Sequence, residues 1–352
     1  MATLRRKDWG LDAGQRMIDD NLSNLEDKLS ALYREAGEGI TQRMNNLTQA
    51  YMGQYNEMLG RVNANLMTED EFNRWKVNYI LRSQQMEAQL RAITEDLVHV
   101  DGIAVQMING ELPVVYASSY NFGIYRADVQ YQMWRGYTDT SFSLYNADAL
   151  RIIQTEDPDL IPWKPCEQDI PKDMRWNRQH VQNAVTQGIL QGDSIDQLSR
   201  RLLPIVNMDE NASRRTARTS YTAIQNQARR DATQAVRDAG IEMEETWMSV
   251  LQANTRDTHL LLHGTHPDKN GEFGAGILRT PLKYPADPDG DPEEIYNCQC
   301  RVQSFIKGLD HSHDREMYER FMEENYYEDW LSVQHYREEE TREALERRMS
   351  FS

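Results

Sequence analysis

Four side chains suited to binding soft metal ions or to nucleophilic chemistry lie in the C-terminal half of the sequence: His259, His263, Cys298 and Cys300. The two histidines are four residues apart, so on a helical turn both imidazoles would project from one face. With the cysteines they supply two nitrogens and two sulfurs, the ligand set of a closed structural zinc site. Cys-x-Cys is, however, tighter than the usual Cys-x2-Cys, and a long loop separates the pairs. The alternative is that His259 hydrogen-bonds locally while the cysteines pack or form a late disulfide.

Two other chemistries are less well supported by the same region. Cys298 or Cys300 could form a thiol–imidazole pair with His259, but no orienting group or oxyanion donor follows at a readable spacing. Carboxylates alternate in the loop from Asp287 to Glu294, although its prolines restrict the wrapping that a calcium loop needs. We therefore predict that the chain is not an enzyme. Zinc is the one candidate cofactor. A thiol- or metal-dependent enzyme is the weaker alternative.

Arginines gather between residues 200 and 237 of this acidic chain. Arg214, Arg218 and Arg229 fall near one helical face, which makes them candidates for contact with DNA phosphates. The ordinary alternative is a solvated face, with Arg218 in a salt bridge to a neighbouring carboxylate.

The composition limits the classes of protein that the chain can belong to. Its 352 residues carry 56 acidic and 39 basic side chains, a net charge of −17. A protein that coats nucleic acid would lean basic, so that role is disfavoured. Three cysteines do not build a disulfide framework, and they fit synthesis in a reducing cytoplasm. We see no signal peptide and no apolar stretch long enough for a transmembrane helix, so no membrane partner is expected.

The first hundred residues predict a long helical hairpin. Apolar and small residues recur from Leu22 to Leu66 about every 3.67 positions, close to an 11-residue repeat, which favours a nearly straight helix. Thr68 and Glu71 form a capping box that starts a second helix, continuing to Leu97. The pattern indicates a packing or spacer module.

The sequence pattern changes after Val98. Apolar residues alternate loosely between residues 98 and 107, and Asn109-Gly110 is a turn signal before Leu112 to Tyr116, so strands are predicted here. Residues 117 to 165 are rich in aromatic and turn residues. The segment predicts a small mixed α+β region.

Helices are predicted again from Lys172 onward. A short one covers Ser194 to Leu202, and a long one capped by Asn211 runs to a stop at Gly240. The long helix is predicted to bury a stripe rich in small residues: Ala217, Tyr221, Ile224, Ala228, Ala232 and Ala235. A strand is predicted at residues 244–252, followed by a Gly- and Pro-rich loop.

An acidic helical tail follows residue 305, and its aromatic residues are predicted to dock a partner. These residues are Tyr326, Tyr327, Trp330, Val333 and Tyr336.

Together these patterns predict a predominantly α-helical α+β protein with a long N-terminal helical hairpin, a small mixed middle region and a helical domain with short β elements. The predicted boundaries are 1–100 for the hairpin, 101–170 for the mixed region, 171–305 for the domain that holds the cysteines, and 306–352 for the tail.

The order of short motifs in the third region is more specific than any one of them. The sequence contains Ala217-Arg218-Thr219-Ser220, Trp247, Thr255-Arg256-Asp257-Thr258-His259, Leu262-His263-Gly264, Phe273, Pro285-Ala286-Asp287-Pro288 and Asn297-Cys298-Gln299-Cys300-Arg301. This order resembles the head-morphogenesis domain of the phage Mu F type, found in minor capsid proteins. The resemblance covers roughly residues 175 to 305. Many relatives have a Cys-x-x-Cys pair near Thr258 to Leu262, where this chain has His259 and His263.

The resemblance implies a minor structural protein of a tailed-phage head, made in the bacterial cytoplasm and located in the virion. Expected partners are the portal protein, the major capsid protein or scaffold, and packaged double-stranded DNA. Expected roles are head assembly and DNA packaging or ejection. The motif residues that identify the family are Trp247, Arg256, Asp257, His259, Gly264, Asn297, Cys298 and Cys300. An assembly scaffold or adaptor outside the virion is the alternative.

Overall fold

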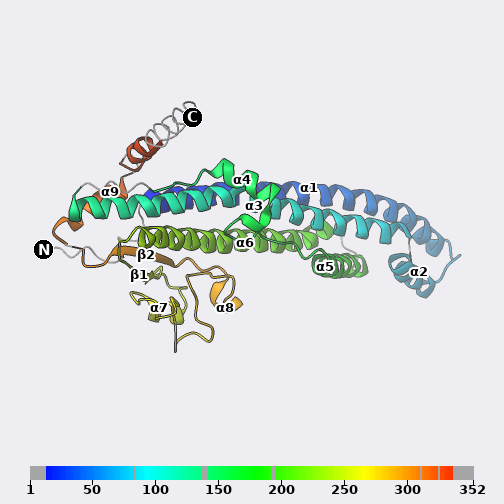
Figure 1. Ribbon diagram of the computed structural model, residues 1–352. Helices are drawn as coiled ribbons and strands as arrows, with labels where there is room; N and C mark the ends of the chain where they lie inside the picture. Colours follow the sequence, from blue (N-terminus) through cyan, green and yellow to red (C-terminus); the bar gives the residue numbers. More distant parts are fainter. Residues whose placement is uncertain are drawn as a thin grey trace, which may run out of the picture. The chain divides into compact units, whose positions relative to one another are not determined.

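The computed structural model describes residues 13–82, 84–136, 142–191, 195–309, 311–323 and 326–335 (Figure 1). The chain packs into two compact units. The helical unit contains the described residues of the ranges Asn24–Asn109 and Cys166–Arg215, and the mixed unit contains those of Met1–Ser23, Gly110–Pro165 and Thr216–Ser352. The elements are α1 Ala13–Asn63, α2 Glu69–Arg82, α3 Gln84–Arg135, α4 Ala147–Glu156, η2 Pro158–Leu160, α5 Ile170–Gln191, α6 Ile195–Asp238, β1 Met243–Met248, α7 Asp257–Leu262, α8 Pro292–Ile295, β2 Arg301–Ile306, η3 His311–His313 and α9 Asp314–Met322.

In the helical unit, α1 and α2 form the turn of the predicted hairpin. The second helix was predicted to continue to Leu97, but α2 ends at Arg82 and the residues from Gln84 onward belong to α3. The capping box is confirmed: Thr68 N–H donates to Glu71 Oε2 over 2.8 Å, and Glu71 N–H donates to Thr68 Oγ1 over 3.2 Å. Aromatic rings then join the two helices. Tyr51 stacks on Trp75 with ring centroids 6.1 Å apart, and Tyr55 lies 5.2 Å from the ring of Phe72. These contacts bury Tyr51 and partly bury Tyr55 near the turn.

The strands predicted between residues 98 and 116 are wrong, because α3 continues through the whole segment. Ala104, Ile108, Leu112 and Val115 are fully buried, and their spacing is that of one helical face. The turn was predicted because Asn109 precedes Gly110, but Asn109 lies inside the helix. Its side chain instead pairs with the backbone of Cys166, accepting from N–H over 2.8 Å and donating to the carbonyl over 3.0 Å.

The predicted helix start at Asn211 is also wrong. α6 runs without a break from Ile195 to Asp238, with Pro204 inside it, and Asn211 is an exposed position within the helix. The end of the helix is as predicted, because Gly240 adopts a left-handed φ of +87° that favours glycine. The predicted stripe of α6 is buried at Ala217, Tyr221, Ile224, Ala228 and Ala232.

The sheet has two antiparallel strands, with Trp247 of β1 opposite Val302 of β2. The predicted strand at residues 244–252 is therefore correct only in its first half, and β2 itself was not predicted. The backbone N–H of Ile306 donates to Gln130 Oε1 over 2.9 Å, which ties β2 to α3 within the mixed unit. Figure 1 shows α7 and α8 grouped beside this sheet.

Two of the tail aromatics, Tyr327 and Trp330, pack inward, whereas Tyr326 and Val333 are each 49% exposed. Tyr327 is 2% exposed, and its ring lies 5.0 Å from that of Phe122 on α3. The indole N–H of Trp330 donates to Asp128 Oδ2 over 2.8 Å. The docking patch was predicted from five residues, and two of them are engaged inside the mixed unit: Tyr327 lies in its core, and Trp330 packs against that core. Tyr326 and Val333 remain on the surface, and Tyr336 lies outside the described residues.

The predicted fold class is confirmed: the protein is predominantly α-helical, with one small sheet in the part that the structure describes. The four domain boundaries predicted from the sequence remain a proposal, because the two compact units are each made of several separate segments of the chain. None of the described helices combines the length and apolar character needed to cross a bilayer.

Candidate functional site

Three of the four predicted metal ligands meet inside the mixed unit. His259 lies on α7, while Cys298 and Cys300 lie in the segment that leads into β2. His259 Nδ1 is 3.6 Å from Cys298 Sγ and 3.4 Å from Cys300 Sγ. All three donor atoms lie within 4.8 Å of one another. The residues are 1%, 2% and 3% exposed, so this cluster, which we call the His–Cys cluster, is enclosed by the core.

His263 does not join the His–Cys cluster. α7 ends at Leu262, and His263 has left the helix with φ −55° and ψ 120°. The prediction assumed that the helix continued for a full turn between the two histidines. Instead, His263 Nδ1 accepts a hydrogen bond from Ser249 N–H over 3.1 Å. The proposed ligand set is thereby reduced to His259, Cys298 and Cys300.

Glu294 on α8 faces the other nitrogen of the histidine, and sequence reasoning missed it. Its Oε2 lies 3.1 Å from His259 Nε2, although the ring is not aligned for a hydrogen bond. Thr258 Oγ1 donates to the same carboxylate oxygen over 2.9 Å. Glu294 is 35 positions from His259 in the sequence, so no local sequence pattern links the two residues.

Two side chains of α6 hold the backbone of the cysteine segment. Thr222 Oγ1 donates to the Cys298 carbonyl over 2.8 Å. Asn226, which is 0% exposed, donates to the Cys300 carbonyl over 3.0 Å and accepts from Val302 N–H over 2.8 Å. The buried helix face thus positions both thiols through the main chain.

Trp247 fills the centre of the core around the cluster. It is fully buried, and its ring lies 5.3 Å from His259 and 5.4 Å from Phe273, edge to face in both cases. Gly264 N–H donates to the Trp247 carbonyl over 2.8 Å. Gly264 has a φ of +78°, which other residues rarely adopt. These two motif residues shape the wall behind His259.

The remaining motif residues fix the loop ends. Arg256 donates to the Tyr296 carbonyl over 2.6 Å, and Asp257 is the first residue of α7. Asn297 takes a positive φ of +57°, and its N–H donates to Thr219 Oγ1 over 2.9 Å. The family motif is therefore mainly a set of structural contacts around the His–Cys cluster.

The electrostatics of the cluster favour one thiolate. A hydrogen bond with Cys298, together with the nearby His259, lowers the pKa of the Cys300 thiol, although burial opposes this. The hydrogen bond with Cys300, together with burial, raises the pKa of Cys298. A thiolate beside an imidazole could act as a nucleophile, but the burial of all three side chains leaves little access for a substrate.

The carboxylates of the loop before α8 are engaged by neighbouring groups. Asp287 Oδ2 accepts from Lys283 N–H over 3.0 Å, and Asp289 is 2.9 Å from Lys283 Nζ. Asp291 is held by Arg279 at 2.6 Å. These pairings give the carboxylates a structural use and further disfavour calcium.

The three DNA-contact candidates all lie on α6 and are all partly buried. In the helical unit, Arg214 pairs with Glu26 at 2.7 Å. In the mixed unit, Arg229 donates to Gln15 Oε1 over 3.1 Å. Arg218 belongs to the mixed unit as well.

The helical unit contains a second group of titratable residues. Tyr33 OH donates to Asp101 Oδ1 over 2.7 Å, and the hydroxyls of Tyr33 and Ser213 lie 2.6 Å apart. Burial raises the pKa of Asp101 to about 6. Burial, together with the charges of Asp101 and Asp173, raises the pKa of Asp209 to about 8. Both carboxyls are therefore more easily protonated in the folded protein.

Replacing Asp209 with asparagine is expected to stabilise the helical unit near pH 8. Its pKa in the fold is about 8, against about 3.9 for an unfolded aspartate. The folded state therefore gains stability from protonated Asp209. That gain is complete below the pKa of the unfolded chain and is lost as the pH rises through the pKa of the folded protein. Asparagine removes that loss. Thermal unfolding of both proteins at about pH 5 and about pH 8 measures the difference in stability. A gain on the order of 1 kcal/mol for Asp209→Asn at the higher pH corresponds to an increase of roughly 2–4 °C in Tm.

The matched control is Asp159→Asn, because Asp159 is exposed and its replacement should change stability by less than about 0.5 kcal/mol. An Asp209→Asn protein whose stability changes with pH as much as the original would contradict this role for Asp209.

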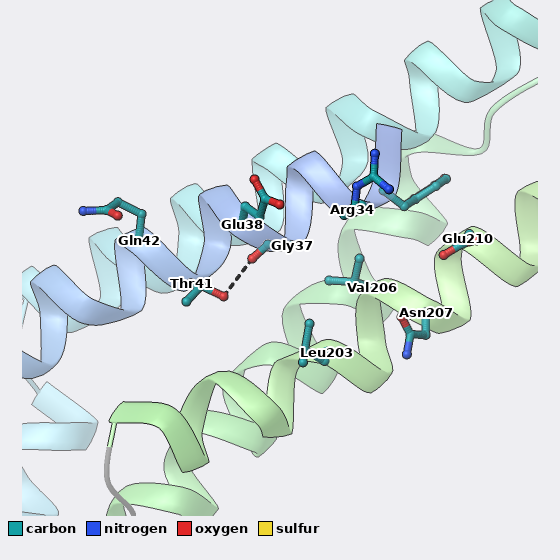
Figure 2. Close-up of a pocket in the computed structure, with 10 residues that line it drawn as sticks. Arg34, Gly37, Glu38, Thr41, Gln42, Leu203, Val206, Asn207 and Glu210 are labelled. Atoms are coloured by element: carbon teal, nitrogen blue, oxygen red, sulfur yellow. Dashed lines mark hydrogen bonds between the residues drawn. The ribbon is translucent and has the colours of Figure 1, made fainter. Parts of the chain in front are cut away.

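A cavity of about 380 Å³ lies between α1 and α6 of the helical unit. Figure 2 shows Leu203 and Val206 on one side and Gly37 and Thr41 on the other. Thr41 Oγ1 donates to the Gly37 carbonyl over 2.8 Å. The lining is that of a helix interface whose side chains do not fill the space completely. The cavity is separate from the His–Cys cluster, which belongs to the mixed unit.

Comparison with known proteins relates this arrangement to phage heads. The chain is 23% identical over 280 residues to Minor head protein GP7 of Bacillus phage SPP1, covering 76% of this chain and 84% of that protein. It is also 23% identical over 155 residues to NAD(+)--arginine ADP-ribosyltransferase EFV of Enterococcus faecalis, covering 44% of this chain but only 31% of that enzyme. No solved structure gives a significant match.

A family model described as phage Mu protein F like protein matches residues 179–303. That range contains the motif residues from Trp247 to Cys300, the His–Cys cluster and the α6 face that holds it. The resemblance predicted from the sequence is thereby confirmed: residues 179–303 match the phage Mu protein F like family, and the chain is similar to a phage minor head protein.

Proposed function

We propose that this protein is a minor structural component of a tailed-phage head. It is located in the virion, bound near the portal and the capsid interior. Its role is in head assembly and in packaging or ejection of DNA. One observation carries the proposal. The similarity to Minor head protein GP7 covers 280 residues, whereas the family segment spans only residues 179–303. The similarity therefore reaches into the long helices outside that segment.

The partners in this proposal are the portal protein and the major capsid protein or scaffold. The acidic balance of the chain, −17, favours protein surfaces over the phosphate backbone as its main contact. Contact of Arg214, Arg218 and Arg229 with packaged DNA is a secondary proposal. A phosphate would compete with Glu26 for Arg214 and with Gln15 for Arg229.

A catalytic role is not part of the proposal. The matched region makes up less than a third of the ADP-ribosyltransferase, so the activity named for that protein is not transferred to this chain. The Cys300 thiol, whose pKa is lowered by its contacts with Cys298 and His259, is only 3% exposed. A buried thiol held by core contacts suits a structural role better than turnover of a large substrate.

Affinity purification tests the portal contact. The chain is co-expressed in bacteria with the portal protein of the phage or prophage that encodes it, and separately with the tail-tube protein of the same genome. We expect the chain to be retained by the portal protein and not by the tail-tube protein. Equal recovery with both proteins, or none with the portal, would contradict portal binding.

A further inference from the structure

The His–Cys cluster has the spacing of a metal site. Zinc bonds of about 2.3 Å to sulfur and about 2.0–2.1 Å to nitrogen place the nitrogen and sulfur ligands of a tetrahedral site roughly 3.5 Å apart. His259 Nδ1 lies 3.6 Å and 3.4 Å from the two sulfurs. An ion could therefore enter between the three donors with little movement of the chain.

The surroundings of His259 match those of a metal-bound imidazole. A histidine that ligates metal through one nitrogen usually donates a hydrogen bond from the other to a carboxylate, which fixes the tautomer and the ring orientation. Glu294 Oε2 is 3.1 Å from His259 Nε2, and Thr258 orients that carboxylate. His259 Nε2 is buried without a hydrogen-bond partner. A small rotation of the ring would join it to Glu294 and leave Nδ1 unprotonated toward the sulfurs.

The cysteine backbone is also arranged for thiolates. Cys300 N–H points at Cys298 Sγ over 3.4 Å, a contact that stabilises negative charge on sulfur. Thr222 and Asn226 fix the carbonyls on either side of that turn. Cysteines bind zinc as thiolates, and the ion would offset the cost of burying both negative charges in the core.

We propose that His259, Cys298 and Cys300 bind one Zn²⁺, with Glu294 as the positioning residue behind His259. A small ligand such as water takes the fourth position. The ion joins α7 to the segment before β2, closing the long loop between residues 262 and 298. Three protein ligands and a water are the usual set of a catalytic zinc site, but all three side chains are at most 3% exposed, so we assign the ion a structural role. The proposal does not depend on where the protein sits in a phage particle.

Metal analysis of the purified full-length chain tests the proposal. We expect about one zinc per chain, by elemental analysis after exhaustive dialysis, from the site stoichiometry. Cobalt should replace zinc and show thiolate-to-cobalt charge transfer together with the visible bands of a tetrahedral ion. Cys298→Ser and Cys300→Ser should lose both the metal and the charge-transfer band.

Two matched controls separate the site from general damage. Cys166→Ser removes the cysteine outside the cluster, and His263→Gln removes the histidine that the structure places elsewhere. Both variants should keep the metal. Because cysteine variants can fail to fold, Glu294→Ala is the second test: it should weaken zinc binding by about 10- to 100-fold, and Glu294→Gln should restore part of that loss.

Three outcomes would overturn the proposal. One is a folded wild-type chain that retains no zinc and gives no cobalt band. Another is intact protein whose mass shows Cys298 and Cys300 joined as a disulfide. The third is loss of metal from the Cys166 and His263 controls to the same degree as from the cluster variants.

Discussion

Replacing Asn226 with leucine should destabilise the mixed unit by about 3–5 kcal/mol, because each buried polar group left without a partner costs about 1–3 kcal/mol. Asn226 is fully buried. Its amide donates to the carbonyls of Pro285 and Cys300, over 3.3 Å and 3.0 Å, and its oxygen accepts from Val302 N–H over 2.8 Å. Leucine has a similar size but can replace none of these bonds. Hydrogen exchange at Val302 and chemical unfolding measure the loss.

Asn226→Asp separates hydrogen bonding from packing. Aspartate keeps the acceptor for Val302 but places a carboxylate against two carbonyl groups. Its pKa should therefore be raised in the folded state, so the variant should be more stable in acid and lose stability as the pH rises. The control is Asn254→Asp at an exposed position. An Asn226→Leu protein within about 0.5 kcal/mol of the original would show that these bonds do not hold the cysteine segment.

Replacing Trp247 with alanine should cost about 3–5 kcal/mol, as expected for removing a buried aromatic side chain. Trp247 is fully buried and packs against His259 and Phe273. Its indole N–H donates to Ser249 Oγ over 3.1 Å. The cavity would lie directly behind the His–Cys cluster, so protection of the sheet amides from hydrogen exchange should fall with the melting temperature.

The matched control is Trp176→Ala in the helical unit. Trp176 is only partly buried, and its ring stacks on His180 at 3.9 Å. That variant should leave exchange in β1 and β2 unchanged. If Trp176→Ala and Trp247→Ala weakened the sheet equally, Trp247 would not be the centre of this core.

Local patterns predicted the parts of the fold that depend on local contacts. The capping box at Thr68 and Glu71 forms as predicted, because both partners lie within one turn. The small-residue stripe of α6 is buried at Ala217 and Ala228. Gly240 ends the helix because its positive φ suits glycine.

Errors arose where tertiary packing overrides local preference. Asn109 resembles half of a turn but pairs with Cys166 from inside α3. The helical spacing of Ala104, Ile108 and Leu112 was present in the sequence, although the valines and isoleucine around it favour strands when considered alone. Asn211 resembled a helix cap but lies within one continuous helix.

The candidate site was predictable by residue type but not by geometry. His259, Cys298 and Cys300 were identified because few side chains bind soft metals, and the structure brings them together. His263 was included because a helix was assumed to continue past Leu262. Glu294 and Asn226 were missed because their contacts join segments far apart in the chain.

Peptide quantification in purified particles tests the central claim most directly. Full virions and empty heads of the encoding phage are separated by density, and peptides of this chain are counted by mass spectrometry relative to the portal protein. We predict a few copies per full virion, at a fixed ratio to the portal. Presence in immature heads with absence from full virions would indicate an assembly scaffold instead, and absence from both would contradict a role in the head.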